Sequence, residues 1–365
     1  MRDVADSPPA GTARREASRW ILHVDLDQFL AAVELRRHPD LVGLPVIVGG
    51  NGDPHEARKV VTCASYEARE FGVHAGMPLR TAARRCPNAT FLPADPAAYD
   101  AASEVVMELL RDLGHPCEVW GWDEAYLAAH TDDPVALAEQ IRAVIAAETG
   151  LSCSVGISDN KQRAKVATGF AKPARVFRLT DTNWMDVMAQ RPVDALWGVG
   201  PKTAKKLAAM GVTTVRDLAH TDAETLTSAF GPSTGLWLLL LAKGGGDDDV
   251  SPQPWVPRSR SHVVTFPTDL TDRGEIDSAV IELAQRTLGE VVADGRIVTR
   301  VAVTVRTSTF YTRTKIRKLA APSTAATVIT ETALAVLDQF ELDRPVRLLG
   351  VRLELQMPAQ ELNRR

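Results

Sequence analysis

The sequence lacks paired cysteines, a long apolar run and an excess of positive charge, and each absence removes a class of protein. Its cysteines, Cys63, Cys86, Cys117 and Cys153, lie far apart, with no C-x-x-C pair or Cys/His cluster. This spacing argues against a zinc site or a redox motif and predicts buried free thiols in a reducing cytoplasm. The longest apolar run, residues 236–242, is far shorter than the roughly 20 residues that span a bilayer. A membrane protein is therefore not expected.

The overall charge gives no sign of a nucleic-acid partner. The formal net charge is -4, so any phosphate-binding surface must come from local segregation of Lys and Arg. The 365 residues are enough for about two to four compact units. Residues 1–18 mix charges of both signs with proline and lack the apolar core of a signal peptide. We expect a disordered tail there and a cytoplasmic protein.

The first half of the chain alternates short apolar segments with amphipathic ones. Strands are predicted at residues 20–24, 45–48, 118–122, 125–127 and 152–157, and helices at residues 28–37, 65–71, 79–86, 97–113 and 134–148. This alternation predicts one α/β domain that ends near residue 180. A small helical unit follows, with helices predicted at residues 203–210 and 215–218.

The second half begins with a change of composition. The segment GGGDDD, with three prolines soon after it, has the composition of a linker that is flexible at first and stiffer later. Beyond it, strands are predicted at residues 261–266, 298–307, 312–319 and 347–355, and helices at residues 276–292 and 325–340. These elements predict a compact α+β module.

Acidic residues occur in two apolar contexts, HVDLDQF with Asp25 and GWDEAYL with Asp123 and Glu124. Phosphoryl transfer needs hard oxygen ligands that hold two Mg²⁺ ions roughly 4 Å apart, and these acids can supply them. Any single Asp at a strand end is more commonly a turn former or a surface charge. Adjacent residues on an ideal strand face opposite ways, so Asp123 and Glu124 converge only if the strand bends or begins there. Gly121 permits such a departure.

These stretches resemble the carboxylate motifs of the Y-family DNA polymerases of the DinB type. The resemblance continues in the expected order with SYEAREFGVHAGM, CSVGISDNKQRAKVAT and FAKPARVFRL, and it covers about residues 19–355. It implies a translesion polymerase with a right-hand fold of α/β and α+β domains. The implied parts are a palm (19–28 and 95–179), fingers (29–94), a helical thumb (180–243), a linker (244–259), a little finger (260–356) and a tail (357–365).

The resemblance also implies which groups carry the chemistry. Asp25 and Asp123 resemble ligands that bridge two divalent ions, Mg²⁺ or Mn²⁺. Glu124 completes the site near the primer 3′-hydroxyl, and the backbone carbonyl of Leu26 is a further ligand. Asp27 is not a metal ligand by this resemblance. We predict for it a helix N-terminal role, in which its side chain accepts backbone N–H groups.

Tyr66, Arg69 and Lys172 match the residues with which the family contacts the triphosphate. Cys63 stands where the family usually has a hydroxyl residue, so one phosphate hydrogen bond is weakened or missing. Leu30 stands where the family has Tyr or Phe, whose ring collides with a 2′-hydroxyl. One hypothesis is that the enzyme accepts rNTPs as well as dNTPs. The alternative is that Leu30 is a core helix residue and that Phe29 or another group excludes the ribose.

The segment LWGVGPKTAKKL resembles a helix-hairpin-helix. Its glycines, Gly198 and Gly200, let backbone N–H groups approach a phosphate, and Lys202 and Lys205 add positive charge. A lone G-x-G is more commonly just a turn. The longer pattern here predicts sequence-independent DNA binding.

A local basic surface lies between residues 296 and 319, which contain seven Lys and Arg and no Asp or Glu. Alternation at strand spacing predicts that Arg313, Lys315 and Arg317 share one face, while Val301, Val303 and Val305 face a core. A solvated sheet face is the plainer interpretation of such a run. By resemblance it is the DNA-binding surface of the little finger, to which Arg300 and Arg306 also belong.

Two other functions remain as alternatives. One is a catalytically silent paralogue that binds DNA as a scaffold, and the other is a nucleotide cyclase with a similar palm. The cyclase leaves the helical unit and the basic module unexplained. The expected partners are primer-template DNA and nucleotides, acting on a monomer. Residues 356–365 lack the hydrophobic-aromatic peptide through which many family members bind the sliding clamp, so clamp binding through them is not expected.

Overall fold

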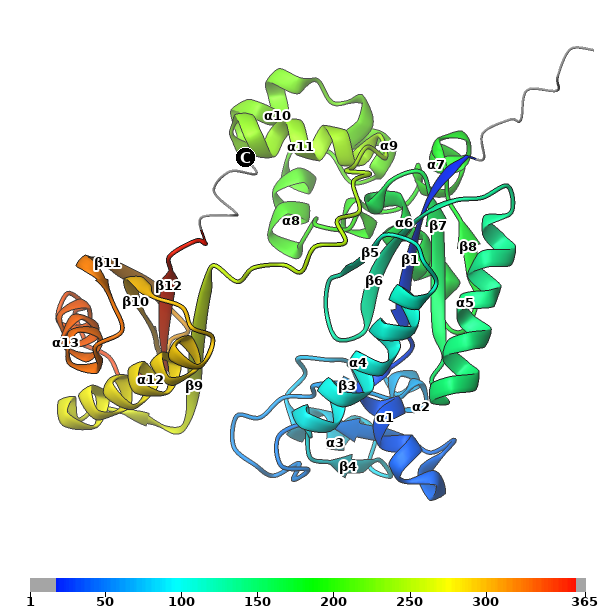
Figure 1. Cartoon of the computed structure of the whole chain (residues 1–365). Coiled ribbons are helices and arrows are strands. Elements are labelled where there is room, and N and C mark those ends of the chain that lie inside the picture. The colour runs from blue at the N-terminus through cyan, green and yellow to red at the C-terminus, as the bar shows by residue number, and fades with distance from the viewer. Residues whose placement is uncertain (1–17, 359–365) are drawn as a thin grey trace, which may run out of the picture. The chain divides into compact units, whose positions relative to one another are not determined.

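The computed structural model describes residues 18–358 (Figure 1). The tails predicted at residues 1–18 and 357–365 therefore lie almost entirely outside the described residues. The chain forms two compact units, one of residues 18–54 and 60–254 and the other of residues 55–59 and 255–358. Among the described residues no helix is long and apolar enough to cross a membrane.

The first unit is built on a five-stranded sheet of order β5-β6-β1-β7-β8. Its strands are β1 (Arg19–Leu26), β5 (Cys117–Val119), β6 (Glu124–His130), β7 (Cys153–Ser158) and β8 (Val176–Arg178). Strand β1 is central and pairs antiparallel with both β6 and β7. Helices α1 (Phe29–Arg37), α4 (Pro96–Asp112) and α5 (Pro134–Thr149) share a core with one face of the sheet.

Helix α6 (Lys161–Ala171) covers the other face of this sheet. It packs closely because Gly156 on β7 has no side chain. A Cβ there would lie 2.1 Å from the carbonyl oxygen of Ala164, closer than two such atoms can approach. The residues of β1 that face α6 are Ile21, His23 and Asp25, whose neighbours Leu22 and Val24 enter the opposite core.

The residues between α1 and α4 form a second, smaller sheet. This three-stranded sheet has the order β3-β2-β4, with β2 (Val46–Val48), β3 (Cys63–Ala64) and β4 (Thr90–Leu92). Helices α2 (Tyr66–Glu70) and α3 (Leu79–Arg85) accompany it. These elements enclose a core of their own around Ile47, Val73 and Leu79.

The helical part of the first unit consists of five short helices around Trp184, Leu207 and Leu238. The helices are α7 (Trp184–Met188), α8 (Pro201–Ala209), α9 (Val215–His220), α10 (Ala223–Phe230) and α11 (Pro232–Ala242). After α11 the first residues of the predicted linker contact the start of α6. The side chain of Asn160 donates to the carbonyl of Gly244, and the backbone N–H of Lys161 donates to the carbonyl of Asp247.

The second unit contains a four-stranded antiparallel sheet of order β11-β10-β12-β9. Its strands are β9 (Ser259–Leu270), β10 (Val298–Thr307), β11 (Thr312–Ser323) and β12 (Val346–Leu355), and its helices are α12 (Arg273–Ala293) and α13 (Ala326–Leu337). Figure 1 shows the two helices lying together against this sheet. Both helices contribute to its core, and within the described part of this unit the opposite face carries no helix.

The register of this sheet divides the predicted basic surface in two. Arg317, Lys315 and Arg313 on β11 lie opposite Val301, Val303 and Val305 on β10. Directly opposed residues of an antiparallel pair point to the same side, so the three cations lie on the helix-covered side. Leu319, next in the same alternation, is buried in that core.

Arg300 and Arg306 alternate with the buried valines of β10 and therefore lie on the open face. The predicted alternation of the three β11 cations is confirmed. The sequence did not predict that the three cations share a side with the valines, because strand spacing fixes which residues share a side but not which side faces the core.

Candidate active site

Strand pairing brings Asp25 and Glu124 together. They are direct partners across the ladder of β1 and β6, so their side chains share the face that α6 covers. Strand β6 begins at Glu124, which is the condition that the sequence set for Asp123 and Glu124 to converge. Asp123 lies in the turn before the strand, where its carbonyl accepts from the backbone N–H of Leu26 at 2.8 Å. The predicted strand at residues 118–122 ends earlier, at Val119.

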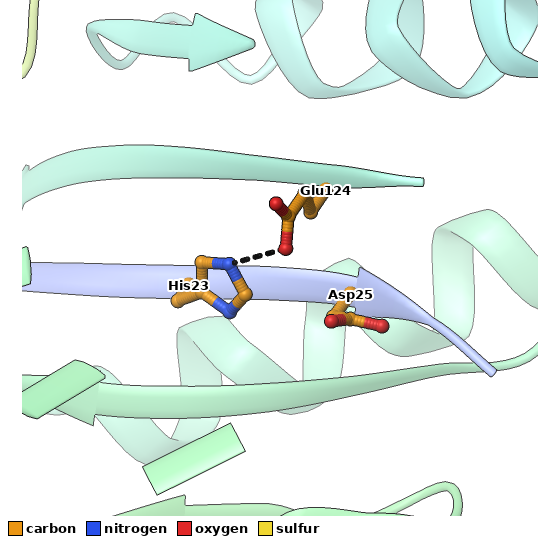
Figure 2. Close-up of side chains that lie close together, drawn as sticks. All are labelled: His23, Asp25 and Glu124. Carbon is orange, nitrogen blue, oxygen red and sulfur yellow. Dashed lines mark ion pairs between the residues drawn. The ribbon is translucent and has the colours of Figure 1, made fainter. Parts of the chain in front are cut away.

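Figure 2 shows Glu124 and Asp25 beside a third side chain, His23. One ligand atom from each lies within 4.8 Å of the others. The Nε2 atom of His23 is 3.3 Å from an Oε of Glu124, and its Nδ1 atom is 2.7 Å from Oγ1 of Thr168. Because both ring nitrogens are engaged, His23 supports Glu124 in this arrangement. Asp123 lies outside that tight group.

The carboxylates have different electrostatic environments. Burial, followed by the charges of Asp25 and Glu124, raises the pKa of Asp123 above its ordinary value. The hydrogen bond from His23, with Lys165 adding to it against the effect of burial, lowers the pKa of Glu124 to about 2. Burial lowers the pKa of His23 itself, which favours the neutral form of the ring. The result is a half-buried cluster of negative charge that favours a cation.

Two lysines from the α6 side occupy this cluster. The ammonium of Lys165 contacts Glu124, and that of Lys172, just past the end of α6, contacts Asp25. Sequence reasoning missed Lys165 and His23. The spacing of each residue could have indicated it. Lys165 and Lys172 are seven residues apart, about two turns of a helix. His23 lies two residues before Asp25, on the same face of the strand.

The donor set fits divalent ions that prefer oxygen. Asp25, Asp123 and Glu124 offer carboxylate oxygens and Leu26 a backbone carbonyl, the ligand types that Mg²⁺ and Mn²⁺ favour. The neighbouring lysines show that this position already attracts positive charge.

A cavity of about 420 Å³ lies beside the acids. Five of the six residues predicted to bind the nucleotide line it, namely Phe29, Leu30, Cys63, Arg69 and Lys172. Tyr66 does not line it. Trp122, which the sequence did not single out, is a further aromatic wall, and its indole N–H donates to Asp100 at 2.7 Å.

Asp27 does not act as predicted. The residue that caps α1 is Gln28, and the cap has no side-chain hydrogen bond. Asp27 instead accepts from the hydroxyl of Tyr66 and from the backbone N–H of Ala174, far from the start of α1. The local sequence could not show these partners because both come from distant segments.

The helix-hairpin-helix segment contains two glycines in different situations. Gly198 has a φ of +97°, and a Cβ there would lie 2.5 Å from the ring of Trp237. Gly200 caps α8 and has open space around it, so its backbone is accessible. Lys202 and Lys205 are exposed on the same helix. This helix start can receive a phosphate.

The chain matches one family over most of its length. The impB/mucB/samB family matches residues 24–169, its C-terminal domain matches residues 257–361, and the DNA polymerase-iota thumb domain matches residues 194–245. DNA polymerase IV 2 of Mycobacterium tuberculosis H37Rv is 74% identical over 342 residues, which cover 93% of this chain and 99% of that protein. DNA polymerase IV of Methanoculleus marisnigri is 37% identical, with coverages of 93% and 94%.

Solved structures agree in fold. A Y-family DNA polymerase chimera superposes with a TM-score of 0.80 at 25% identity, over 92% of this chain and 98% of that one. DinB from Sulfolobus solfataricus gives a TM-score of 0.62 at 26% identity over the same shares. The fold is that of a right-hand polymerase with a thumb and a C-terminal little-finger domain. Within this class, the chain belongs to the DNA polymerase IV (DinB) family of Y-family polymerases, as the sequence motifs indicated.

Proposed function

We propose that this DNA-directed DNA polymerase joins dNTPs to a primer 3′-hydroxyl by two-metal nucleotidyl transfer of the translesion type, with Asp25, Asp123 and Glu124 as its catalytic carboxylates. The observation that carries the proposal is the direct pairing of Asp25 with Glu124. It concentrates negative charge beside Asp123, whose pKa is raised by burial and then by that charge. Such a cluster is unfavourable until cations neutralise it.

The three acids and the Leu26 carbonyl would hold the ions. When bound, the metals would activate the 3′-hydroxyl and neutralise charge on the triphosphate and the leaving group. The protein's own cations have separate roles. Arg69 and Lys172 line the cavity and are proposed to bind phosphate oxygens. His23 holds Glu124 in place, and Lys165 neutralises this carboxylate until a metal ion replaces its ammonium.

Primer extension tests this proposal. The wild-type chain should extend a primed template only with a divalent metal, and Asp123→Ala should abolish extension while leaving DNA affinity intact. Asp112→Asn is the matched control, because Asp112 is an exposed acid at the end of α4. A protein that binds the primed template but never extends it would instead support the scaffold function.

We further propose that the enzyme accepts ribonucleotides, because Leu30 lines the cavity where a planar ring would collide with a 2′-hydroxyl. Phe29 is the alternative excluding group. It also lines the cavity, but it is only 3% exposed and its ring lies edge-on to that of Tyr99 at 6.5 Å. Extension with each rNTP alone is the test, and a strong preference for dNTPs would remove this part of the proposal.

The DNA-binding roles are proposed for two regions. Backbone N–H groups at Gly198 and Gly200, with Lys202 and Lys205, are proposed to bind one phosphate strand. In the second unit the proposed contacts are Arg300, Arg306, Arg313, Lys315 and Arg317. Because only Arg300 and Arg306 lie on the open face, we expect these two to contribute most.

A further inference from the structure

Asp27 is a buried carboxylate beside the nucleotide cavity, and the function proposed above gives it no role. It is 1% exposed. Among the residues that the structure describes, no Lys, Arg or His forms an ion pair with it. A buried charge without a cation must be satisfied by hydrogen-bond donors, so the donors around Asp27 show what it organises.

Four donors converge on this carboxylate. Its Oδ1 accepts from the hydroxyl of Tyr66 at 3.0 Å and from that of Ser154 at 2.9 Å. Its Oδ2 accepts from the hydroxyl of Ser152 at 3.1 Å and from the backbone N–H of Ala174 at 2.9 Å. Tyr66 belongs to α2, the serines to β7 and the residue before it, and Ala174 to the turn between α6 and β8. One side chain therefore joins three separate segments.

Two of these donors lead to the proposed phosphate-binding cations. The ring of Tyr66 lies under the guanidinium of Arg69, 4.9 Å from its centre. Ala174, with a φ of +51°, ends the turn that begins at Lys172. Holding the Tyr66 ring and this turn in place therefore restrains both cationic side chains, Arg69 and Lys172.

The Tyr66 hydroxyl is itself committed. A phenol has one proton to donate, and Asp27 accepts it. Burial, followed by the negative charge of Asp27, raises the pKa of Tyr66, which keeps that proton in place. While it is bound to Asp27, Tyr66 cannot donate to a phosphate oxygen, in agreement with its absence from the cavity wall.

We infer that Asp27 is a positioning residue for the triphosphate site, acting on Arg69 through the Tyr66 ring and on Lys172 through the turn that Ala174 ends. The inference rests on the proposed function, since it assigns a role in binding the nucleotide substrate. Loss of this positioning should raise KM for the nucleotide and change kcat little, because Asp25, Asp123 and Glu124 are unaltered.

The mildest test uses two serines on one strand. Ser154→Ala removes one donor to Asp27 and touches nothing in the cavity, whereas Ser158, also fully buried on β7, donates to Asp159. We expect Ser154→Ala to raise KM for dNTP about threefold, with kcat and DNA affinity within about twofold of wild type. Ser158→Ala should leave all three unchanged.

Asp27→Asn is the stronger test. The amide can accept at only one of the two positions, so KM should rise about tenfold or more with kcat little changed. Adding Tyr66→Phe to Asp27→Asn should raise KM little further, because the hydroxyl acts through Asp27. The matched control is Tyr99→Phe, since Tyr99 also donates to a buried carboxylate, that of Glu34, at 2.8 Å.

Direct nucleotide binding separates this inference from the proposed function. Trp122 lines the cavity, so its fluorescence should report dATP binding in Ca²⁺ without any reaction. A wild type that binds dATP but never extends a primer contradicts the proposed function alone. Unchanged dATP affinity in a folded Asp27→Asn protein, or equal effects of Ser154→Ala and Ser158→Ala, overturns the inference. If Asp27→Asn does not fold, the serine pair decides.

Discussion

The two large sheets of this protein use pairing register in opposite ways. In the five-stranded sheet, register places Asp25 directly opposite Glu124 and gathers charge of one sign on one face. In the four-stranded sheet, register places Arg313, Lys315 and Arg317 on the side of the helices and leaves Arg300 and Arg306 on the other. The first arrangement concentrates charge and the second divides it. A single substitution should therefore have a large effect on activity in the first sheet and only a small effect on DNA binding in the second.

Of the changes that compare the two sheets, the one at Glu124 should have the largest effect. Glu124→Gln keeps the size of the side chain but removes its charge from the cluster, and kcat should fall on the order of 1,000-fold or more. Single-turnover extension of a primed template measures this change. DNA affinity should stay within about threefold of wild type, since Glu124 is not among the residues proposed to contact the duplex. A fall of less than tenfold would contradict the idea that this face concentrates the chemistry.

A second decisive change is expected at Leu30, on the wall of the same cavity. Leu30→Phe introduces a planar ring and should reduce rNTP use relative to dNTP use by roughly 100-fold in kcat/KM. Leu30→Met is the control, because it keeps a similar volume without a ring. Equal discrimination in both variants would show that the ring is not what excludes the ribose.

Metal binding offers a test of charge concentration without catalysis. Adding Mg²⁺ to about 100 times its dissociation constant should stabilise the wild type by about 2.7 kcal/mol, seen as a rise in Tm. Asp25→Asn should lose most of this rise. Lys165→Gln removes the competing ammonium that contacts Glu124, so it should bind Mg²⁺ more tightly than the wild type. Weaker binding in Lys165→Gln would mean that the lysine orders the site rather than competing for it.

The same contrast explains what the sequence could predict. The motifs around Asp25 and Asp123 are contiguous in sequence, so the family was identifiable and the acids and the cavity residues Arg69 and Lys172 could be predicted. Alternation correctly placed Arg313, Lys315 and Arg317 on one side. The side itself depends on which residue of β10 each one faces, and that is a property of strands joined across the sheet.

Partners from distant segments were missed for the same reason. Asp27 was predicted to serve the helix that follows it, because helix starts commonly use such a residue. Its actual donors include Tyr66 and Ser154, and only the folded chain brings them together. His23 and Lys165 support Glu124 from β1 and α6 in the same way. The sequence supplied the groups, and the tertiary structure supplied their partners.

The smallest effects are expected in the four-stranded sheet, where charge is divided. On the open face, Thr304 and Gly350 lie side by side between Arg300 and Arg306, and such small residues let a phosphate backbone come close. On the other side, Lys315 already donates to the carbonyl of Gln339 beyond the end of α13.

Arg300→Ala with Arg306→Ala should therefore weaken DNA binding about tenfold at low salt. It should also lower the slope of log affinity against log salt by about 0.9 for each phosphate that the variant no longer neutralises. Arg313→Ala with Lys315→Ala should weaken binding no more than about threefold. At saturating DNA, kcat should be the same in both double variants. If the second pair has the larger effect, the duplex lies along the β11 edge, and the division of charge by register carries no functional meaning.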